Sequence, residues 1–195
     1  GLSTSGIVWD VTNRHEPKQI ELLPSGNGFV FQLETDTIRE FVAFNGTTYL
    51  TPDPVGFITY QNLHGLPQAD MLIVTHANFT GQANRLADLH RAEGLIVHVV
   101  TTEQVFNEFS SGMLDPTAIR MFAKMFYDRS KTNPTHSPKY LLLFGDGTFD
   151  PKGRASNNNN YVPTYQFLNS ENHISCMVSD DYFGMLDDNE SISAT

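Results

Sequence analysis

Three nearly unbroken apolar runs of strand length constrain the fold of this chain more than any other feature. They read MLIVT at 71–75, LIVHVV at 95–100 and KYLLLFG at 139–145. A strand that lies between two layers of helices carries apolar residues on both faces, so a continuous run is typical of a parallel sheet. We therefore predict three neighbouring strands that are buried on both sides.

Stretches with helical spacing separate these runs. The apolar residues of 80–92 keep to one helical face, and Gly94 follows at a position typical of a helix end. Asp115 and Pro116 supply an N-cap and a first helical residue for a helix over 116–128. The order strand, helix, strand, helix, strand predicts right-handed crossovers and an α/β fold with a parallel three-layer sheet.

Residues 1–67 follow a different pattern. Phe29, Phe31 and Leu33 recur at every second position, which is typical of a strand with one apolar face. The sequence PSGN at 24–27 predicts a hairpin turn before them. We predict a small β-rich segment over 1–67, the end of a sandwich-like domain, followed by an α/β subdomain over 68–195.

Composition excludes several classes of function. Twelve Lys and Arg face 22 Asp and Glu, a net charge of −10, and no basic cluster occurs, so we expect no nucleic-acid partner. No apolar run approaches the ~18 residues of a membrane span. Cys176 is the single cysteine, which rules out an internal disulfide. Because the chain opens without an initiator Met or a signal-peptide pattern, we expect a processed piece of a longer protein.

Acidic residues follow the ends of two apolar pieces. Asp146 comes directly after the run 139–145, and Asp187 and Glu190 close the stretch SDDYFGMLDDNE at 179–190. Parallel α/β sheets bind ligands where their strands end, and Ca²⁺ prefers carboxylate and carbonyl oxygens. One interpretation is therefore a structural calcium site that joins Asp146 to Asp187 and Glu190. The other is that Asp187, Asp188 and Asn189 form an exposed turn.

Catalytic motifs are absent or incomplete in the sequence. The stretch FGDGT at 144–148 is similar to the first motif of haloacid-dehalogenase phosphatases, but Phe144 stands where that chemistry needs a nucleophilic carboxylate. No P-loop, G-x-S-x-G or H-E-x-x-H motif occurs. Cys176 has His173 nearby, but in a strand the two side chains would point to opposite sides, and free cysteines are usually buried. We therefore assign no catalytic residue.

The loop DPKGRASNNNNYVPTY at 150–165 contains four consecutive Asn and two Pro residues. Such a composition excludes a helix or a central strand. We predict a solvated surface loop.

Several motifs in the same order carry a family resemblance. The stretches VWDVTNRHEP, LLLFGDGTFD, YVPTYQF and SDDYFGMLDD, together with the strand–helix alternation, resemble the gingipain family of cysteine peptidases. The resemblance is strongest to the branch that acts as signal peptidase and sortase in type IX secretion. It covers essentially the whole chain and is most specific over 139–187. It implies two caspase-like α/β subdomains, of which this chain supplies the first.

The resemblance also implies where the chemistry lies. In the family a second subdomain supplies a His–Cys dyad, and neither its Gly-His-Gly context nor a matching cysteine occurs here. We therefore expect an inactive fragment of a cell-surface, outer-membrane-associated bacterial enzyme. The implied partners are other type IX components and secreted cargo proteins, whose C-terminal sorting domain the enzyme removes. A non-catalytic adaptor of the same fold and an independent metal-dependent α/β hydrolase are the alternatives.

The resemblance bears on calcium as well. In gingipains the aspartate that matches Asp146 is a calcium ligand, and further ligands come from a loop that corresponds to about 187–190. That loop differs here in length and sequence, so only Asp146 carries over residue for residue.

Overall fold

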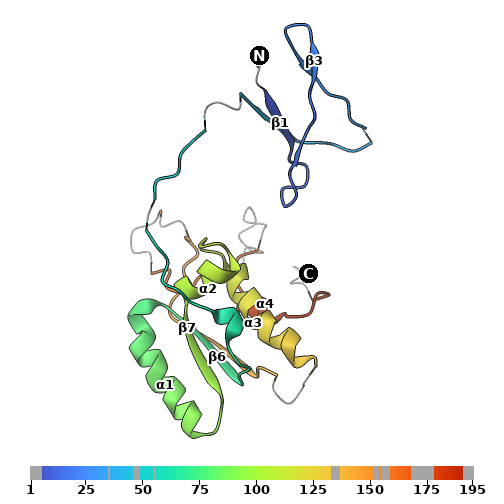
Figure 1. Cartoon of the computed structure of the whole chain (residues 1–195). Helices are drawn as coiled ribbons and strands as arrows, with labels where there is room; N and C mark the ends of the chain where they lie inside the picture. The colour runs from blue at the N-terminus through green and yellow to red at the C-terminus, as the bar shows by residue number, and fades with distance from the viewer. Residues whose placement is uncertain are drawn as a thin grey trace. The chain divides into compact units, whose positions relative to one another are not determined.

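The computed structural model describes residues 6–34, 36–45, 49–54, 56–132, 137–151, 154, 159–167 and 178–190. The chain divides into two compact units, Gly1–Ile58 and Thr59–Thr195 (Figure 1). Each unit has its own sheets and is described by itself.

The first unit is built from short antiparallel strands. β1 (Ile7–Asp10) pairs with β2 (Lys18–Gln19) on one side and with β5 (Phe41–Phe44) on the other. β3 (Leu23–Ser25) and β4 (Gly28–Val30) form the predicted hairpin. The small antiparallel β-structure predicted from the sequence is confirmed.

Two details of the hairpin follow from local chemistry. Its two turn residues begin with Gly26, whose φ of +57° lies in the left-handed region that glycine adopts without cost. β4 ends at Val30, so the strand is shorter than the alternation to Leu33 predicts. The ring of Phe31 instead packs on that of Phe41, with centroids 5.2 Å apart.

The second unit contains the predicted parallel sheet. β6 (Met71–Thr75) lies between β7 (Val97–Thr101) and β8 (Tyr140–Phe144), and both neighbours run parallel to it. Every residue of β6 is buried. The three apolar runs therefore form one sheet with the most apolar strand at its centre, as the sequence predicts.

Helices cover both faces of this sheet. On one face, α1 (Thr80–Ala92) places Ala83 and Ala87 against alternate residues of β6 and β7. On the other, α2 (Thr102–Phe109) and α3 (Pro116–Ser130) pack against the remaining residues of β6 (Figure 1). The result is the predicted three-layer arrangement. No helix in the described part of the chain is both long and apolar enough to cross a membrane.

The two predicted helices are found, and α2 is an addition. It begins directly after β7 with a capping box, in which Thr101 Oγ1 accepts a hydrogen bond from Gln104 N at 3.2 Å. The Gln104 side chain in turn accepts from Thr101 N at 2.9 Å. This T-x-x-Q pattern was the sequence signal for the helix. The remaining elements are short: η1 (Leu63–Gly65), η2 (Ala77–Phe79) and α4 (Asp181–Gly184).

Candidate functional site

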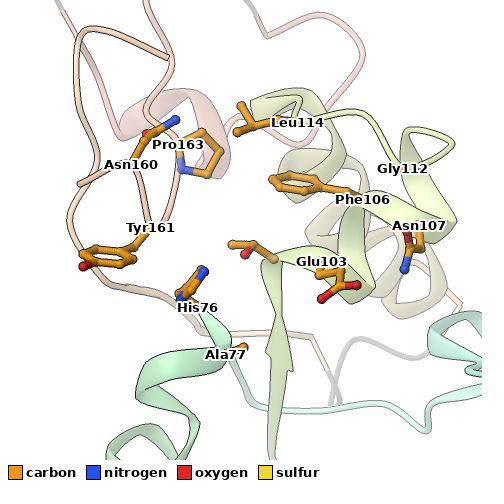
Figure 2. Close-up of a pocket in the computed structure, with 11 residues that line it drawn as sticks. His76, Ala77, Glu103, Phe106, Asn107, Gly112, Leu114, Asn160, Tyr161 and Pro163 are labelled. Atoms are coloured by element: carbon orange, nitrogen blue, oxygen red, sulfur yellow. The ribbon is translucent and has the colours of Figure 1, made fainter. Parts of the chain in front are cut away.

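The carboxyl ends of the three parallel strands meet at one edge of the sheet, where open α/β sheets bind their ligands. A cavity of about 230 Å³ lies at this edge, beside the ends of β6 and β7 (Figure 2). Its lining combines aromatic and aliphatic walls with a few polar groups. The lining residues are His76, Ala77, Thr102, Glu103, Phe106, Asn107, Gly112, Leu114, Asn160, Tyr161 and Pro163.

His76 follows the central strand directly and is held in place by two kinds of contact. Its Nδ1 accepts a hydrogen bond from Asn78 N at 3.2 Å and so caps η2. Its ring lies against Tyr161, with centroids 5.1 Å apart, as Figure 2 shows. With Nδ1 engaged as an acceptor, the neutral imidazole carries its proton on Nε2 and presents a donor there.

The Gly-Asp-Gly motif after β8 is explained by close packing. Gly145 has a φ of +155°, and a Cβ on it would lie 3.0 Å from Val162 Cγ2. A Cβ on Gly147 would collide with Thr164 Cγ2 and lie 2.6 Å from Val162 O. Between the two glycines, Asp146 O accepts hydrogen bonds from the backbone N of Tyr161 and of Val162 at 2.9 and 3.0 Å. The motif therefore docks residues 160–164 onto the end of β8.

The end of the Asn-rich loop differs from its prediction as a solvated loop. Val162 and Pro163 are buried, and Tyr161 packs edge-to-face on Phe79 with centroids 4.8 Å apart. The Tyr-Val-Pro sequence is the apolar signal for this burial, and it directly follows four asparagines that are typical of a solvated loop. The prediction of a solvated loop was wrong for Val162 and Pro163, which are buried, and Tyr161 beside them is half-buried.

The acidic residues predicted to bind calcium have different surroundings. Asp146 is exposed at the end of β8. Asp187 Oδ2 accepts a hydrogen bond from Tyr127 OH at 2.9 Å, and its Oδ1 lies 3.3 Å from Lys131 Nζ. These contacts lower the pKa of Asp187, the hydrogen bond from Tyr127 most. Glu190 Oε2 accepts from Asp187 N at 3.0 Å, which closes a turn.

The structure thus ties the segment 187–190 to α3 by protein contacts. Lys124 Nζ adds an ion pair with Asp188 at 3.1 Å. In the described ranges, no three His, Cys, Asp or Glu side chains gather in a way that could hold a metal ion. A cation that joined Asp146 to Asp187 and Glu190 would compete with the ammonium of Lys131. The calcium site stays a prediction, and no step of the function below depends on it.

Cys176 and His173 fall outside the residues that the structure describes. Two residues that line the cavity and that the sequence did not indicate are Asn160 and Tyr161. Their positions depend on the docking of residues 160–164 onto the Gly-Asp-Gly turn, which spacing along the chain does not reveal.

Comparisons with known proteins agree with this architecture. The model of Peptidase family C25 matches residues 64–194, more than half of the chain. The chain is also similar to a solved structure, that of dimeric latent PorU from Porphyromonas gingivalis, with 36% sequence identity and a TM-score of 0.82. That match covers 97% of this chain and 19% of the PorU chain, so the present chain spans about a fifth of it. No curated protein matches.

Proposed function

Because the chain belongs to peptidase family C25, the gingipain family, we propose that it is one section of a cysteine peptidase or sortase of type IX secretion. The enzyme would remove the C-terminal sorting domain of secreted cargo proteins at the surface of the bacterial outer membrane. Its partners would be those cargo proteins and other type IX components. The observation that carries the proposal is the 36% identity to PorU over 97% of the chain.

Within that enzyme, we assign this section a supporting role. A cysteine peptidase needs a thiolate and a histidine base within hydrogen-bonding reach of each other. His76, the histidine at the carboxyl edge of the sheet, already uses Nδ1 to cap η2, and its ring packs at a tilt against Tyr161. Tyr161 packs on Phe79, and Val162 lies against Gly145 at the end of β8. We therefore propose that the His–Cys dyad is supplied by a part of the protein outside these 195 residues.

Cleavage assays on two proteins test the proposal. The full-length product of the gene and the 195-residue chain are each incubated with a cargo protein that carries its C-terminal sorting domain. The full-length protein should release the sorting domain, and pretreatment with iodoacetamide should abolish the release. The Cys176→Ala variant should retain it, and the 195-residue chain should release nothing.

Two results would contradict the proposal. A full-length protein that binds cargo without cleaving it would favour the non-catalytic adaptor. Turnover by the 195-residue chain that Cys176→Ala abolishes would place the nucleophile in this section.

A further inference from the structure

The chain continues from α4 along α3, and its two successive parts are attached to α3 in different ways. The first part, α4 and the two residues after it, is fixed against α3 by burial (Figure 1). Phe183 is 1% exposed, and Leu186 packs against the same core cluster. Two backbone carbonyls of this part also accept hydrogen bonds from α3. Arg120 Nε donates to Met185 O at 2.6 Å, and Lys124 Nζ donates to Leu186 O at 2.9 Å.

The second part is residues 187–190, which we call the strap. It is held to α3 by polar contacts of exposed or half-exposed side chains, and none of its residues is buried. In the ion pair of Asp187 with Lys131 the two side chains are 49% and 47% exposed. In the second ion pair Lys124 is mostly buried, but its partner Asp188 is 84% exposed. The hydrogen bond from the tyrosine hydroxyl to Asp187, described above, is the third contact.

The two parts should differ in the free energy needed to detach them from α3. Burial of Phe183 is not an electrostatic interaction, so dissolved salt does not screen it. An exposed ion pair contributes little to stability, and at about 1 M salt its range of action falls to about 3 Å. Local opening of a folded protein begins where few apolar contacts hold the chain. The strap is therefore the part that detaches first, and the change from one kind of attachment to the other falls between Leu186 and Asp187.

We propose that the strap is a salt-sensitive latch that opens at a hinge between Leu186 and Asp187, while α4 stays on α3. In the closed form, Asp187 pairs with the ammonium of Lys131 and accepts the hydrogen bond of Tyr127. In the open form, these two groups at the C-terminal end of α3 face solvent, and the chain after Glu190 continues from a different place. The latch thus couples ionic conditions to the position of the residues that follow. It rests on contacts within this chain and does not depend on the proposed function.

Distances between spin labels on the 195-residue chain test the latch. One label is attached through Met121→Cys on an exposed position of α3 and the other through Asn189→Cys on the strap, and Cys176→Ala removes the natural thiol. At about 50 mM NaCl one short distance should dominate. At about 1 M NaCl a longer and broader distance should become about fivefold more populated. A chelator is present throughout, so that divalent cations play no part.

A second pair of labels tests the hinge. Gly184, in α4, has open space where a Cβ would lie, so Gly184→Cys can carry a label without a clash. Its distance to the label at position 121 should be the same at both salt concentrations. If both pairs lengthened together, α4 would leave α3 with the strap. If the distance to position 189 did not change, the strap would not open. Either result would overturn the proposal.

A matched pair of variants tests the ion pair that closes the latch. Asp187→Asn removes the charge that faces Lys131 and keeps an oxygen for the hydroxyl of Tyr127. The open form should therefore become about fivefold more populated already at low salt, and the response to salt should shrink. Asp88→Asn removes the same charge from an exposed ion pair with Arg91 on α1 and should change neither quantity. Equal effects of the two variants, or no effect of Asp187→Asn, would show that this ion pair does not close the strap and would overturn the proposal.

Discussion

Replacing Glu108 with glutamine tests how the start of the second unit is fixed to α2. The Glu108 carboxylate accepts hydrogen bonds from the backbone N of Leu63 and of His64, at 2.6 and 3.1 Å. It also contacts His64 Nδ1 at 2.6 Å and Gln61 Nε2 at 2.9 Å. The side chain is only 15% exposed, so solvent screens these contacts little.

The pKa of Glu108 gives the size of the contribution that these contacts make to the free energy of unfolding. Burial alone raises this pKa, but the four hydrogen bonds outweigh burial and lower it from 4.5 to about 2. A difference of about 2.5 pKa units corresponds to about 3 kcal/mol. Because the pKa is lower in the folded state, this stability is present above pH 4.5 and is lost as the pH falls toward 2.

Glu108→Gln should therefore lower the free energy of unfolding at pH 7 by about 2–3 kcal/mol, since an amide cannot accept all four bonds. The midpoint of thermal unfolding should fall by about 8 °C. Urea unfolding followed by circular dichroism at pH 7, 5, 4 and 3 measures the difference from the wild type, which should shrink below pH 4.5. Glu103→Gln, an exposed residue of the same helix, is the control and should cost at most about 0.5 kcal/mol. A loss of stability that is equal for both variants, or constant with pH, would show that the Glu108 carboxylate does not hold residues 61–64 to α2.

Two other perturbations address the Gly-Asp-Gly turn and the predicted calcium site. Gly147→Ala should destabilise the protein by about 2–3 kcal/mol, because the added methyl meets Thr164 and the Val162 carbonyl, whereas Gly81→Ala has open space in α1 and should stabilise by about 0.5–1 kcal/mol. Urea unfolding compares them, and equal effects would show that the turn relaxes freely. If Asp146 is a calcium ligand, millimolar Ca²⁺ should raise the melting temperature of the wild type relative to chelator, and Asp146→Asn should lose this rise. Melting temperatures that do not change with Ca²⁺, or that change equally in the wild type and in Asp146→Asn, would show that Asp146 is only a turn residue.

The parallel sheet could be predicted from the sequence because its strands are nearly unbroken apolar runs. β6 is apolar at nearly every position, and its bounds agree with the predicted run 71–75. α2 escaped detection because its apolar positions cover only two turns, so that its capping box at Thr101 was the stronger signal. Short helices give little periodicity, and their ends then carry most of the information.

The site was less predictable because its contacts join residues far apart in the chain. Gly147 could be interpreted from the sequence as part of a ligand-binding motif. In the structure it packs closely against Thr164, which follows 17 residues later in the chain. Likewise, Asp187 was predicted to follow a strand, but the element before it is the helix α4, and its partners Tyr127 and Lys131 lie on α3. Spacing along the chain gives the type of side chain at a strand end, and only the packing gives the group that it meets.

We propose above that this chain supports a catalytic dyad supplied by another part of the same protein. The most direct measurement treats the full-length protein with a peptide that matches the cargo cleavage site and carries a thiol-reactive electrophile, followed by mass spectrometry of the modified cysteine. We expect modification of a cysteine outside these 195 residues, and we expect it to be undiminished in Cys176→Ala. Modification of Cys176 itself, or of no cysteine in a protein that cleaves cargo, would contradict it.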